Sequence, residues 1–335
     1  MKIGVIGTGM MGAQLAIRLA KSGHEVIVFN RDRSKAQIVQ HSITENKIRM
    51  ASTPAEVGNN AKFVIVCVKD HQAILDITTA KGDAGLIDSP NSDRTGKDFI
   101  VIQCSTISPT ESNHVADLYG NKSIKVITVP IIGGISAAER GELILIAAGP
   151  KKSFIRAKSL LKDISKQVFY VGSNHGTAST LKLAVNINIA LIALALAEGL
   201  AFVKGTGLDP DIFIKILNST YFRTGLSENK GPKIIHDEYS PSFSVANMAK
   251  DLKLTLQTAY SSGLTLPVTA SRYLQGLGIS GPIEFGLHFS SFFHIKAKWN
   301  QSLRKKKKGR IVALIFYYRP YSSTLISTTN VFSDS

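Results

Sequence analysis

Cysteine is scarce in this chain. Of its 335 residues only Cys67 and Cys104 are cysteines, and each lies inside an apolar run. Two such thiols exclude a disulfide framework and the spacing of a structural zinc site, so we expect buried, reduced cysteines and no metal. A strand pattern begins at Lys2, which leaves no room before it for a signal peptide, and we therefore expect a cytoplasmic protein.

Acidic residues are also few. There are 24 Asp and Glu against 40 Lys and Arg, which gives a formal net charge of +16. Nine of the basic residues lie in residues 280–335, together with only two acids, and the others are spread without a stripe or interleaved aromatics. This spacing favours solvated surface charge over a nucleic-acid site, except for one formed by the basic tail itself.

No apolar run is long enough to cross a bilayer. Residues 187–203 come nearest, but Glu198 interrupts them and they fall short of the ~20 residues that a span needs. We therefore expect no membrane segment. Apolar residues on all sides of this run are typical of a helix that is buried in a core.

Lys182 and Asn186 come just before that run. Residues four apart share a helix face, so the ammonium and the carboxamide point into the same space. A lysine there can extend to the surface and an asparagine can bridge helices. Because a buried lysine is costly without a function, we interpret Gly172 to Val203 as the domain boundary and the candidate catalytic element.

Three glycines are clustered directly after the first predicted strand. A strand at residues 2–6 leads into Gly7-Thr8-Gly9-Met10-Met11-Gly12, then an amphipathic helix, then a strand at residues 25–29. This order is the dinucleotide-binding pattern: Gly7 allows a tight turn, Gly9 lets the backbone approach a pyrophosphate, and Gly12 lets helix and strand pack closely. The alternative is a glycine turn that binds nothing.

The end of the second strand indicates which dinucleotide binds. Asn30 stands where an acidic residue would bind the ribose 2′-hydroxyl of NAD, and Arg31, Arg33 and Lys35 follow it. An arginine fork suits a 2′-phosphate, so the sequence predicts NADP(H) in preference to NAD(H), with Arg31 as the main contact. Asp32 is too far along the chain to take the acidic position.

Further buried strands are predicted at residues 62–68, 97–102, 124–129 and 143–148, with a turn-rich surface connection at 81–97. Strands that alternate with helices predict an α/β fold, a doubly wound sheet of mainly parallel strands. Ligands bind beyond the carboxyl ends of such strands. Thr8, Asn30, Lys69, Thr106 and Gly133 all follow strands in this way.

After the long helix the pattern becomes helical, with segments at residues 210–218, 244–261 and 267–274 separated by polar loops. We therefore predict a Rossmann domain over 1–172 and an all-α domain over 173–278 that the interdomain helix begins. Residues 279–335 have a Lys/Arg run, an aromatic cluster and a Ser/Thr-rich end without a consistent period. They are either a functional arm, a disordered tail, or sequence foreign to the fold.

Together these motifs resemble the β-hydroxyacid dehydrogenases, a family that includes 3-hydroxyisobutyrate dehydrogenases and glyoxylate or succinic semialdehyde reductases and is related to 6-phosphogluconate dehydrogenase. The resemblance covers about residues 1–275. Five stretches carry it, in the family's order: the glycine loop with the basic residues that follow it, 104–109, 130–134, Lys182 with Asn186, and Phe243 with 249–252.

The resemblance implies roles for these residues. Lys182 would act as general acid in reduction and as general base in oxidation, while Asn186 would orient a small carboxylic acid or aldehyde substrate. Lowered basicity of Lys182, from burial and nearby positive charge, would suit that role. The resemblance also implies homodimers or homotetramers. It also places Thr106, Lys250 and Asp251 at the cofactor. The residues that it places at the substrate are Ile132, Gly133, Gly134 and Phe243.

Two departures from the family pattern stand out, and the first concerns the substrate. Ile132 stands where the family has a serine that binds the substrate carboxylate, and Ala178 replaces a glycine before the lysine. An imine reductase-like activity is therefore an alternative, although the lysine counts against it. A third possibility is a catalytically idle cofactor-binding module that uses the basic tail on nucleic acid.

Overall fold

The computed structural model describes residues 1–335 except 44–46, 81, 83, 90–98, 239–242 and 271–335. The described residues all belong to one compact unit, Met1–Phe289. The predicted tail at 279–335 and most of the helix expected at 267–274 lie outside the described residues.

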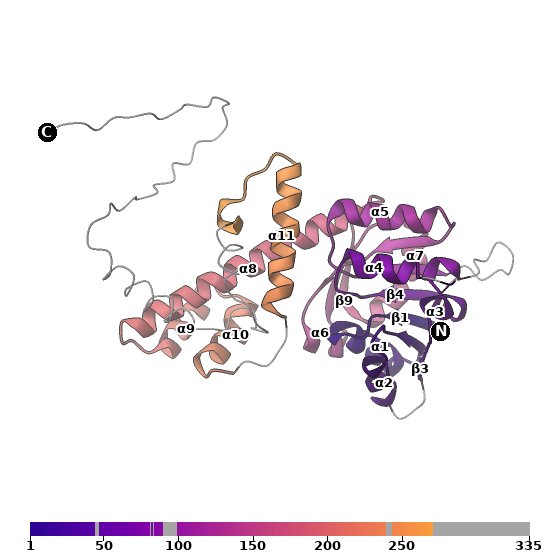
Figure 1. Ribbon diagram of the computed structural model, residues 1–335. Coiled ribbons are helices and arrows are strands. Elements are labelled where there is room, and N and C mark those ends of the chain that lie inside the picture. Colours follow the sequence, from indigo (N-terminus) through magenta and orange to yellow (C-terminus); the bar gives the residue numbers. More distant parts are fainter. Residues whose placement is uncertain (44–46, 81, 83, 90–98, 239–242, 271–335) are drawn as a thin grey trace, which may run out of the picture. The chain divides into compact units, whose positions relative to one another are not determined.

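A six-stranded parallel sheet forms the centre of the N-terminal part, in the order β3-β2-β1-β4-β5-β6 (Figure 1). Its strands are β1 (Lys2–Ile6), β2 (Glu25–Phe29), β3 (Ile48–Met50), β4 (Phe63–Val66), β5 (Ile100–Gln103) and β6 (Lys125–Thr128). Strand order reverses between β1 and β4, which is where a doubly wound sheet binds its ligand. The predicted fold class is confirmed.

Helices cover both faces of this sheet because its strands are apolar on both sides. They are α1 (Met10–Lys21), α2 (Arg33–His41), α3 (Pro54–Asn60), α4 (His71–Thr78), α5 (Pro109–Gly120), α6 (Ile135–Arg140) and α7 (Lys151–Asp163). On β1, Ile3 and Val5 pack into one hydrophobic cluster with α1, whereas Ile6 packs into the opposite cluster with α3 and α5. Within the region predicted as a surface connection, the short 3₁₀ helix Leu86–Asp88 buries Leu86 completely.

A second sheet of three strands follows, in the order β7-β8-β9. Its strands are β7 (Ile131–Ile132), β8 (Leu143–Ala147) and β9 (Ser165–Tyr170). Only β8 was predicted, because β7 has two residues and β9 alternates polar and apolar residues weakly. Thr128 at the end of β6 bridges Ala148, so this sheet continues from the carboxyl edge of the first.

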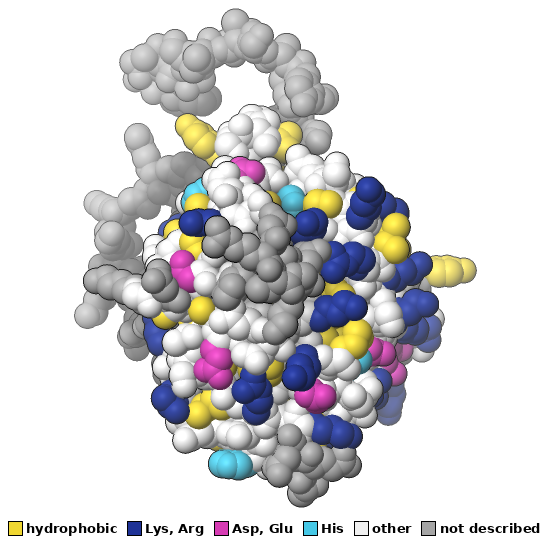
Figure 2. All heavy atoms as spheres, turned by 90° about the vertical axis from the view of Figure 1, so that its right-hand side faces the viewer, with side chains coloured by type: hydrophobic (Ala, Val, Ile, Leu, Met, Phe, Trp, Pro, Cys, Tyr) yellow, Lys and Arg dark blue, Asp and Glu magenta, His cyan; other side chains and the backbone are white. Residues whose placement is uncertain are grey.

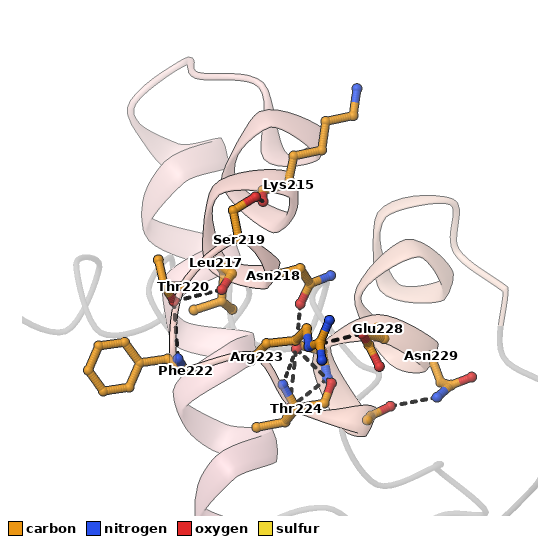
Figure 3. Close-up of polar contacts among 12 residues, drawn as sticks. Lys215, Leu217, Asn218, Ser219, Thr220, Phe222, Arg223, Thr224, Glu228 and Asn229 are labelled. Atoms are coloured by element: carbon orange, nitrogen blue, oxygen red, sulfur yellow. Dashed lines mark hydrogen bonds and ion pairs between the residues drawn. The ribbon is translucent and has the colours of Figure 1, made fainter.

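The C-terminal part is helical, as predicted. It contains α8 (His175–Gly205), α9 (Pro210–Asn218), α10 (Gly225–Ile235) and α11 (Val245–Ser261). The prediction of a polar loop after residue 218 is wrong where α10 lies. Thr224 caps this helix, since its Oγ1 accepts a hydrogen bond of 2.9 Å from the Ser227 amide, and Arg223 pairs with Glu228 (Figure 3). Pro232 lies inside this helix, and because proline is unfavourable in a helix interior, the sequence pattern did not predict α10.

The expectation that α8 is buried on all sides is wrong for the single chain. Leu196 and Leu200 are buried, but Ile192 is 39% exposed and Phe202 is 73% exposed. Among the described residues α8 is also the one helix whose length and composition would allow it to cross a membrane. It is longer than the apolar run of the sequence and begins well before it.

Basic side chains are numerous on the face that Figure 2 shows, with few acidic side chains among them. The sequence predicted no basic stripe, yet one helix carries a series of exposed basic residues. They lie on α7 at Lys151, Lys152, Arg156, Lys158 and Lys162. Each lies at most four positions from the next, so the helix brings together basic residues that look evenly spread in the sequence.

Candidate active site

The first turns of α8 are fixed against α5. Asn113 Oδ1 accepts a hydrogen bond of 3.0 Å from the Gly176 amide, and Asn174 caps the helix at the same amide. The buried hydroxyls of Ser112 and Ser179 lie 2.6 Å apart. A Cβ at Gly176 would be 3.0 Å from the Pro109 carbonyl, so a glycine permits this approach. These contacts fix where the next turn of α8 points.

That next turn carries Lys182, which is buried together with Asn186. Lys182 Nζ donates a hydrogen bond of 3.0 Å to Asn186 Oδ1, and Asn186 Nδ2 donates one of 2.6 Å to Asp251 Oδ2. The amide can therefore adopt only one orientation, with its oxygen toward the ammonium. Asp251, on α11, is 2% exposed and holds this orientation.

Lys250 connects the same group to the end of β5. Its Nζ donates a hydrogen bond of 2.6 Å to the Thr106 carbonyl and lies 2.9 Å from Asp251 Oδ1. Thr106 follows β5 at the carboxyl edge of the sheet, which is the ligand-binding edge. Five predicted site residues thus form one connected network: Thr106, Lys182, Asn186, Lys250 and Asp251.

Burial changes the proton affinity of this network. The pKa of Lys182 is lowered to about 8, chiefly by burial; the charge of Asp251 opposes this shift and that of Lys250 adds to it. For Asp251, burial raises the pKa of the carboxyl, and Lys250 and Lys182 counteract that effect. A lysine with a pKa near neutrality can both give and take a proton at physiological pH.

The glycine loop lies where β1 meets α1. Gly7 has φ +93°, and a Cβ on it would collide with the Cys67 carbonyl, while a Cβ on Gly12 would collide with the Gly7 carbonyl. Beside Gly9 there is open space, since no atom lies within 4 Å of the position that its Cβ would take. The predicted roles of the three glycines match this geometry.

The loop also offers free polar groups. The Thr8 hydroxyl is buried and has no hydrogen-bond partner, and no side chain at Gly9 caps the first amides of α1, which include those of Met10 and Met11. Unpaired helix-terminal amides bind phosphate groups. The residues present therefore fit the pyrophosphate of a dinucleotide.

The basic residues after β2 remain at the surface. Arg31 is 88% exposed in its side chain, with Nη1 3.7 Å from Asp76, and Lys35 Nζ lies 3.6 Å from Asp32. Asp32 Oδ1 accepts a hydrogen bond of 3.1 Å from the Ser34 amide and caps α2. Its carboxylate is thus engaged at the start of α2. Asn30 ends the strand, and Arg33 is the first residue of α2.

Two predicted substrate residues lie at opposite ends of one stripe on α8. The stripe consists of Ala178, Lys182, Asn186 and Ala190, all buried and each four residues from the next. Ile132 packs in the cluster that contains Ala178, and Phe243 packs in the cluster that contains Ala190. Sequence reasoning named the residues but not these contacts, because the pairs are far apart in the chain.

Gly133 and Gly134 join β7 to α6. Gly133 has φ +131°, a conformation that favours glycine, and a Cβ there would be 2.8 Å from a Leu143 methyl group. Nothing lies within 4 Å of the position of a Cβ on Gly134. The residues nearest to the Cβ position of Gly133 are Leu143 and Ala137, not Lys182.

Sequence reasoning missed one connection at the sheet edge. The Val68 amide donates a hydrogen bond of 2.9 Å to Ser105 Oγ, which ties the segments after β4 and β5 together. A polar residue directly after a buried strand was the available signal. Among the described residues no group of three or more His, Cys, Asp or Glu side chains could hold a metal ion.

Comparison with known proteins decides the family. Residues 2–172 match the NAD-binding domain of 6-phosphogluconate dehydrogenase, which is half of the chain, and residues 176–273 match the NAD-binding domain of NADP-dependent 3-hydroxyisobutyrate dehydrogenase. The chain belongs to the β-hydroxyacid dehydrogenase family. As a member of that family it is an oxidoreductase that uses a nicotinamide cofactor to interconvert hydroxy acids and carbonyl compounds.

Individual relatives agree with this assignment. Glyoxylate/succinic semialdehyde reductase 1 of Arabidopsis thaliana is 29% identical over 272 residues, which cover 81% of this chain and 90% of the relative. A 3-hydroxyisobutyrate dehydrogenase of Salmonella typhimurium has the same fold, with a TM-score of 0.74, 20% identity, and coverage of 85% and 97% of the two chains. An imine reductase of Streptomyces aurantiacus is less similar, with a TM-score of 0.56, 17% identity, and coverage of 88% and 99%.

Proposed function

We propose that this β-hydroxyacid dehydrogenase interconverts a small 3-hydroxy acid and its semialdehyde, or reduces glyoxylate or succinic semialdehyde, with NADP(H) preferred over NAD(H). One observation carries the proposal: Lys182 is buried, has its pKa lowered to about 8, and is held by Asn186 and Asp251. Such a lysine is equipped for proton transfer rather than for solubility.

In reduction, Lys182 donates a proton to the carbonyl oxygen of the substrate. The bound nicotinamide supplies the hydride at the carbonyl carbon, or accepts it in the reverse direction. Lys182 Nζ uses one of its three protons on Asn186 Oδ1, so two remain for a substrate oxygen. In oxidation the neutral amine accepts the proton of the hydroxyl group.

Asn186 and Asp251 position Lys182 before the substrate arrives. The amide oxygen of Asn186 faces the ammonium because its nitrogen is committed to Asp251. Thr106 and Lys250 bring the end of β5 to the same network, which places the carboxyl edge of the sheet beside the lysine. Preorganisation of this kind avoids reorganisation at the moment of proton transfer.

The residues that would hold the pyrophosphate of the cofactor are Gly7, Gly9 and Gly12 together with Thr8. The preference for NADP(H) rests on the exposed Arg31, with Arg33 and Lys35 nearby, and on the engagement of Asp32 in capping α2. A 2′-phosphate would replace Asp76 as the partner of Arg31, as an arginine fork favours a dianion over a single carboxylate oxygen at 3.7 Å.

We further propose a cytoplasmic homodimer or homotetramer that assembles through the helical part. Exposed apolar side chains on two of its helices support this assembly, among them Ile192 and Phe202 on α8 and Ile212 and Ile216 on α9. Contiguous exposed apolar surface is typical of interfaces. A second copy would also cover the part of α8 that the single chain leaves open.

An imine reductase-like activity is the second candidate. The apolar surroundings of Ile132 and the fold likeness to an imine reductase favour it. Lys182 in its network favours carbonyl reduction, because a carbonyl oxygen needs a proton donor of this kind. The third possibility, an idle module acting through a basic tail, concerns residues outside those described.

The proposal is tested by following NADPH and NADH oxidation at 340 nm. The substrates are glyoxylate, succinic semialdehyde, methylmalonate semialdehyde, tartronate semialdehyde and a cyclic imine. We expect turnover of at least one semialdehyde, with a higher kcat/KM for NADPH than for NADH. A folded protein that binds NADPH but reduces only the imine would support the second candidate, and one that reduces none of these compounds would overturn the proposed activity.

A further inference from the structure

The two residues that depart from the family pattern lie together in the fold. Ile132, on β7, packs in a small hydrophobic cluster formed by Ile146, Ala148 and Ala178, with Val171 beside it. Ala178 is completely buried, while Ile132 is half-buried and retains an open side. All five members of the cluster are aliphatic, so no side chain within it can bind an anion.

This cluster adjoins the catalytic lysine. Ala178 and Lys182 are four residues apart on α8 and share a helix face, about 6 Å apart along the axis. The polar network runs the other way along the same stripe, since Lys182 contacts Asn186 and through it Asp251. One side of Lys182 is therefore polar and the side toward Ile132 is apolar.

We propose that Ile132, backed by the buried Ala178, forms an apolar wall beside Lys182 that selects semialdehydes in which a hydrocarbon segment separates the carbonyl from the carboxylate. The inference rests on the proposed function and names its substrate class. In glyoxylate the carboxylate is bonded directly to the carbonyl carbon, and a pose against this wall would strip water from it without a hydrogen bond in return. In succinic semialdehyde two methylene groups can occupy that position.

The network of Lys182, Asn186, Lys250 and Asp251 can attract both glyoxylate and succinic semialdehyde through its charge. Lys182 and Lys250 face one carboxylate, Asp251, so protonated Lys182 leaves one positive charge in excess. That charge acts at longer range than a hydrogen bond and does not distinguish the two acids by itself. Discrimination therefore falls to the wall.

The test compares kcat/KM for succinic semialdehyde and for glyoxylate with NADPH in the wild-type protein and in Ile132→Thr and Ile132→Val. Threonine and valine have nearly the same β-branched shape, but only threonine can donate a hydrogen bond to a carboxylate. For the wild type we expect a ratio of about 10 or more in favour of succinic semialdehyde, the value of two buried methylene groups. The ratio should fall about ten-fold in Ile132→Thr and less than about three-fold in Ile132→Val.

Ile132→Ser is the second variant, because it also places a hydroxyl at the half-buried position 132 if Ile132→Thr does not fold, whereas the fully buried Ala178 cannot reach a substrate. It should lower the ratio in the same direction, and thermal unfolding with NADPH titration reports whether each variant is intact. Equal ratios in the threonine and valine variants, or a wild type that prefers glyoxylate, would overturn the wall while leaving the reductase intact. A wild type that binds NADPH but reduces neither acid would overturn both proposals.

Discussion

Lys182 is the residue on which the account of catalysis depends. It is buried, and its surroundings lower its pKa to about 8. Its partners are equally constrained, because Asn186 is fixed between the ammonium and Asp251. A surface lysine would have neither the shift nor the fixed partner, so the chemistry of this position follows from burial.

The pH dependence of each direction follows from that shift. Reduction requires the protonated lysine, so kcat/KM should be constant below pH about 8 and fall tenfold per unit above it. Oxidation requires the neutral amine, so its rate should rise up to the same pH and then level off. Steady-state profiles in both directions measure this, and a reduction rate that stays constant from pH 7 to 10 would contradict the role of Lys182.

Asp251 should set the pH at which kcat/KM for reduction begins to fall, which we call the basic limb of the profile. Its negative charge raises the pKa of Lys182, against the effect of burial. Asp251→Asn keeps an acceptor for Asn186 but removes the charge, so the limb should move to lower pH by about 1 unit. Asp211→Asn, on α9, is the matched control and should leave the profile unchanged. A loss of rate without any movement of the limb would mean that Asp251 acts on structure alone.

At the scale of elements, the glycine loop was predictable and the contacts between elements were not. Gly7, Gly9 and Gly12 follow from local requirements, a positive φ, open space and close packing, that a short stretch of sequence displays. Ile132 and Ala178 belong to one hydrophobic cluster although they are 46 positions apart, and no local pattern encodes this proximity. Asp251, 65 positions from Asn186, was named only because of the family resemblance.

Two elements that the sequence did not predict, β7 and α10, also depend on contacts with other parts of the chain. β7 has two residues and exists because β8 pairs with it, and α10 contains Pro232 and few apolar residues. Its start is fixed by the cap at Thr224, whose hydroxyl contacts both the amide and the hydroxyl of Ser227. Tertiary contacts, rather than intrinsic propensity, decide such short or polar segments.

The glycine loop gives a prediction that separates binding from folding. Gly9→Ala should fold normally, because its Cβ would meet no atom of the protein, but it should weaken NADPH binding at least about ten-fold by occupying the space of the pyrophosphate. Gly12→Ala should lose stability as well, since its Cβ would collide with the Gly7 carbonyl. NADPH titration together with thermal unfolding measures both, and wild-type affinity in Gly9→Ala would place the cofactor elsewhere.

For the whole molecule, the exposed apolar surface of the helical part needs an explanation. Sequence periodicity predicted burial of α8 on all sides, whereas Phe202 is 73% exposed and Ile216, on α9, is 60% exposed. The homodimer or homotetramer that we propose would cover this surface and account for the apolar pattern. The sequence therefore predicted the fold of the chain well and its surface less well.

We expect sedimentation velocity to give the mass of a dimer or tetramer. Ile216→Glu should shift the distribution toward the monomer, because it puts a charge into the apolar surface of α9. Lys215→Glu is the matched control, since its side chain extends away from the polar contacts of this region (Figure 3) and contributes little apolar area. A wild type that sediments as a monomer at micromolar concentration would contradict the assembly.

The most direct test of the central claim is a single-turnover measurement of hydride transfer. Protein saturated with NADPH is mixed with succinic semialdehyde, and the loss of absorbance at 340 nm is compared between the wild type and Lys182→Ala. We expect the rate of hydride transfer to be at least ~10²-fold lower in Lys182→Ala, with NADPH affinity unchanged within about three-fold. A variant that transfers hydride at the wild-type rate would show that Lys182 is not the proton donor.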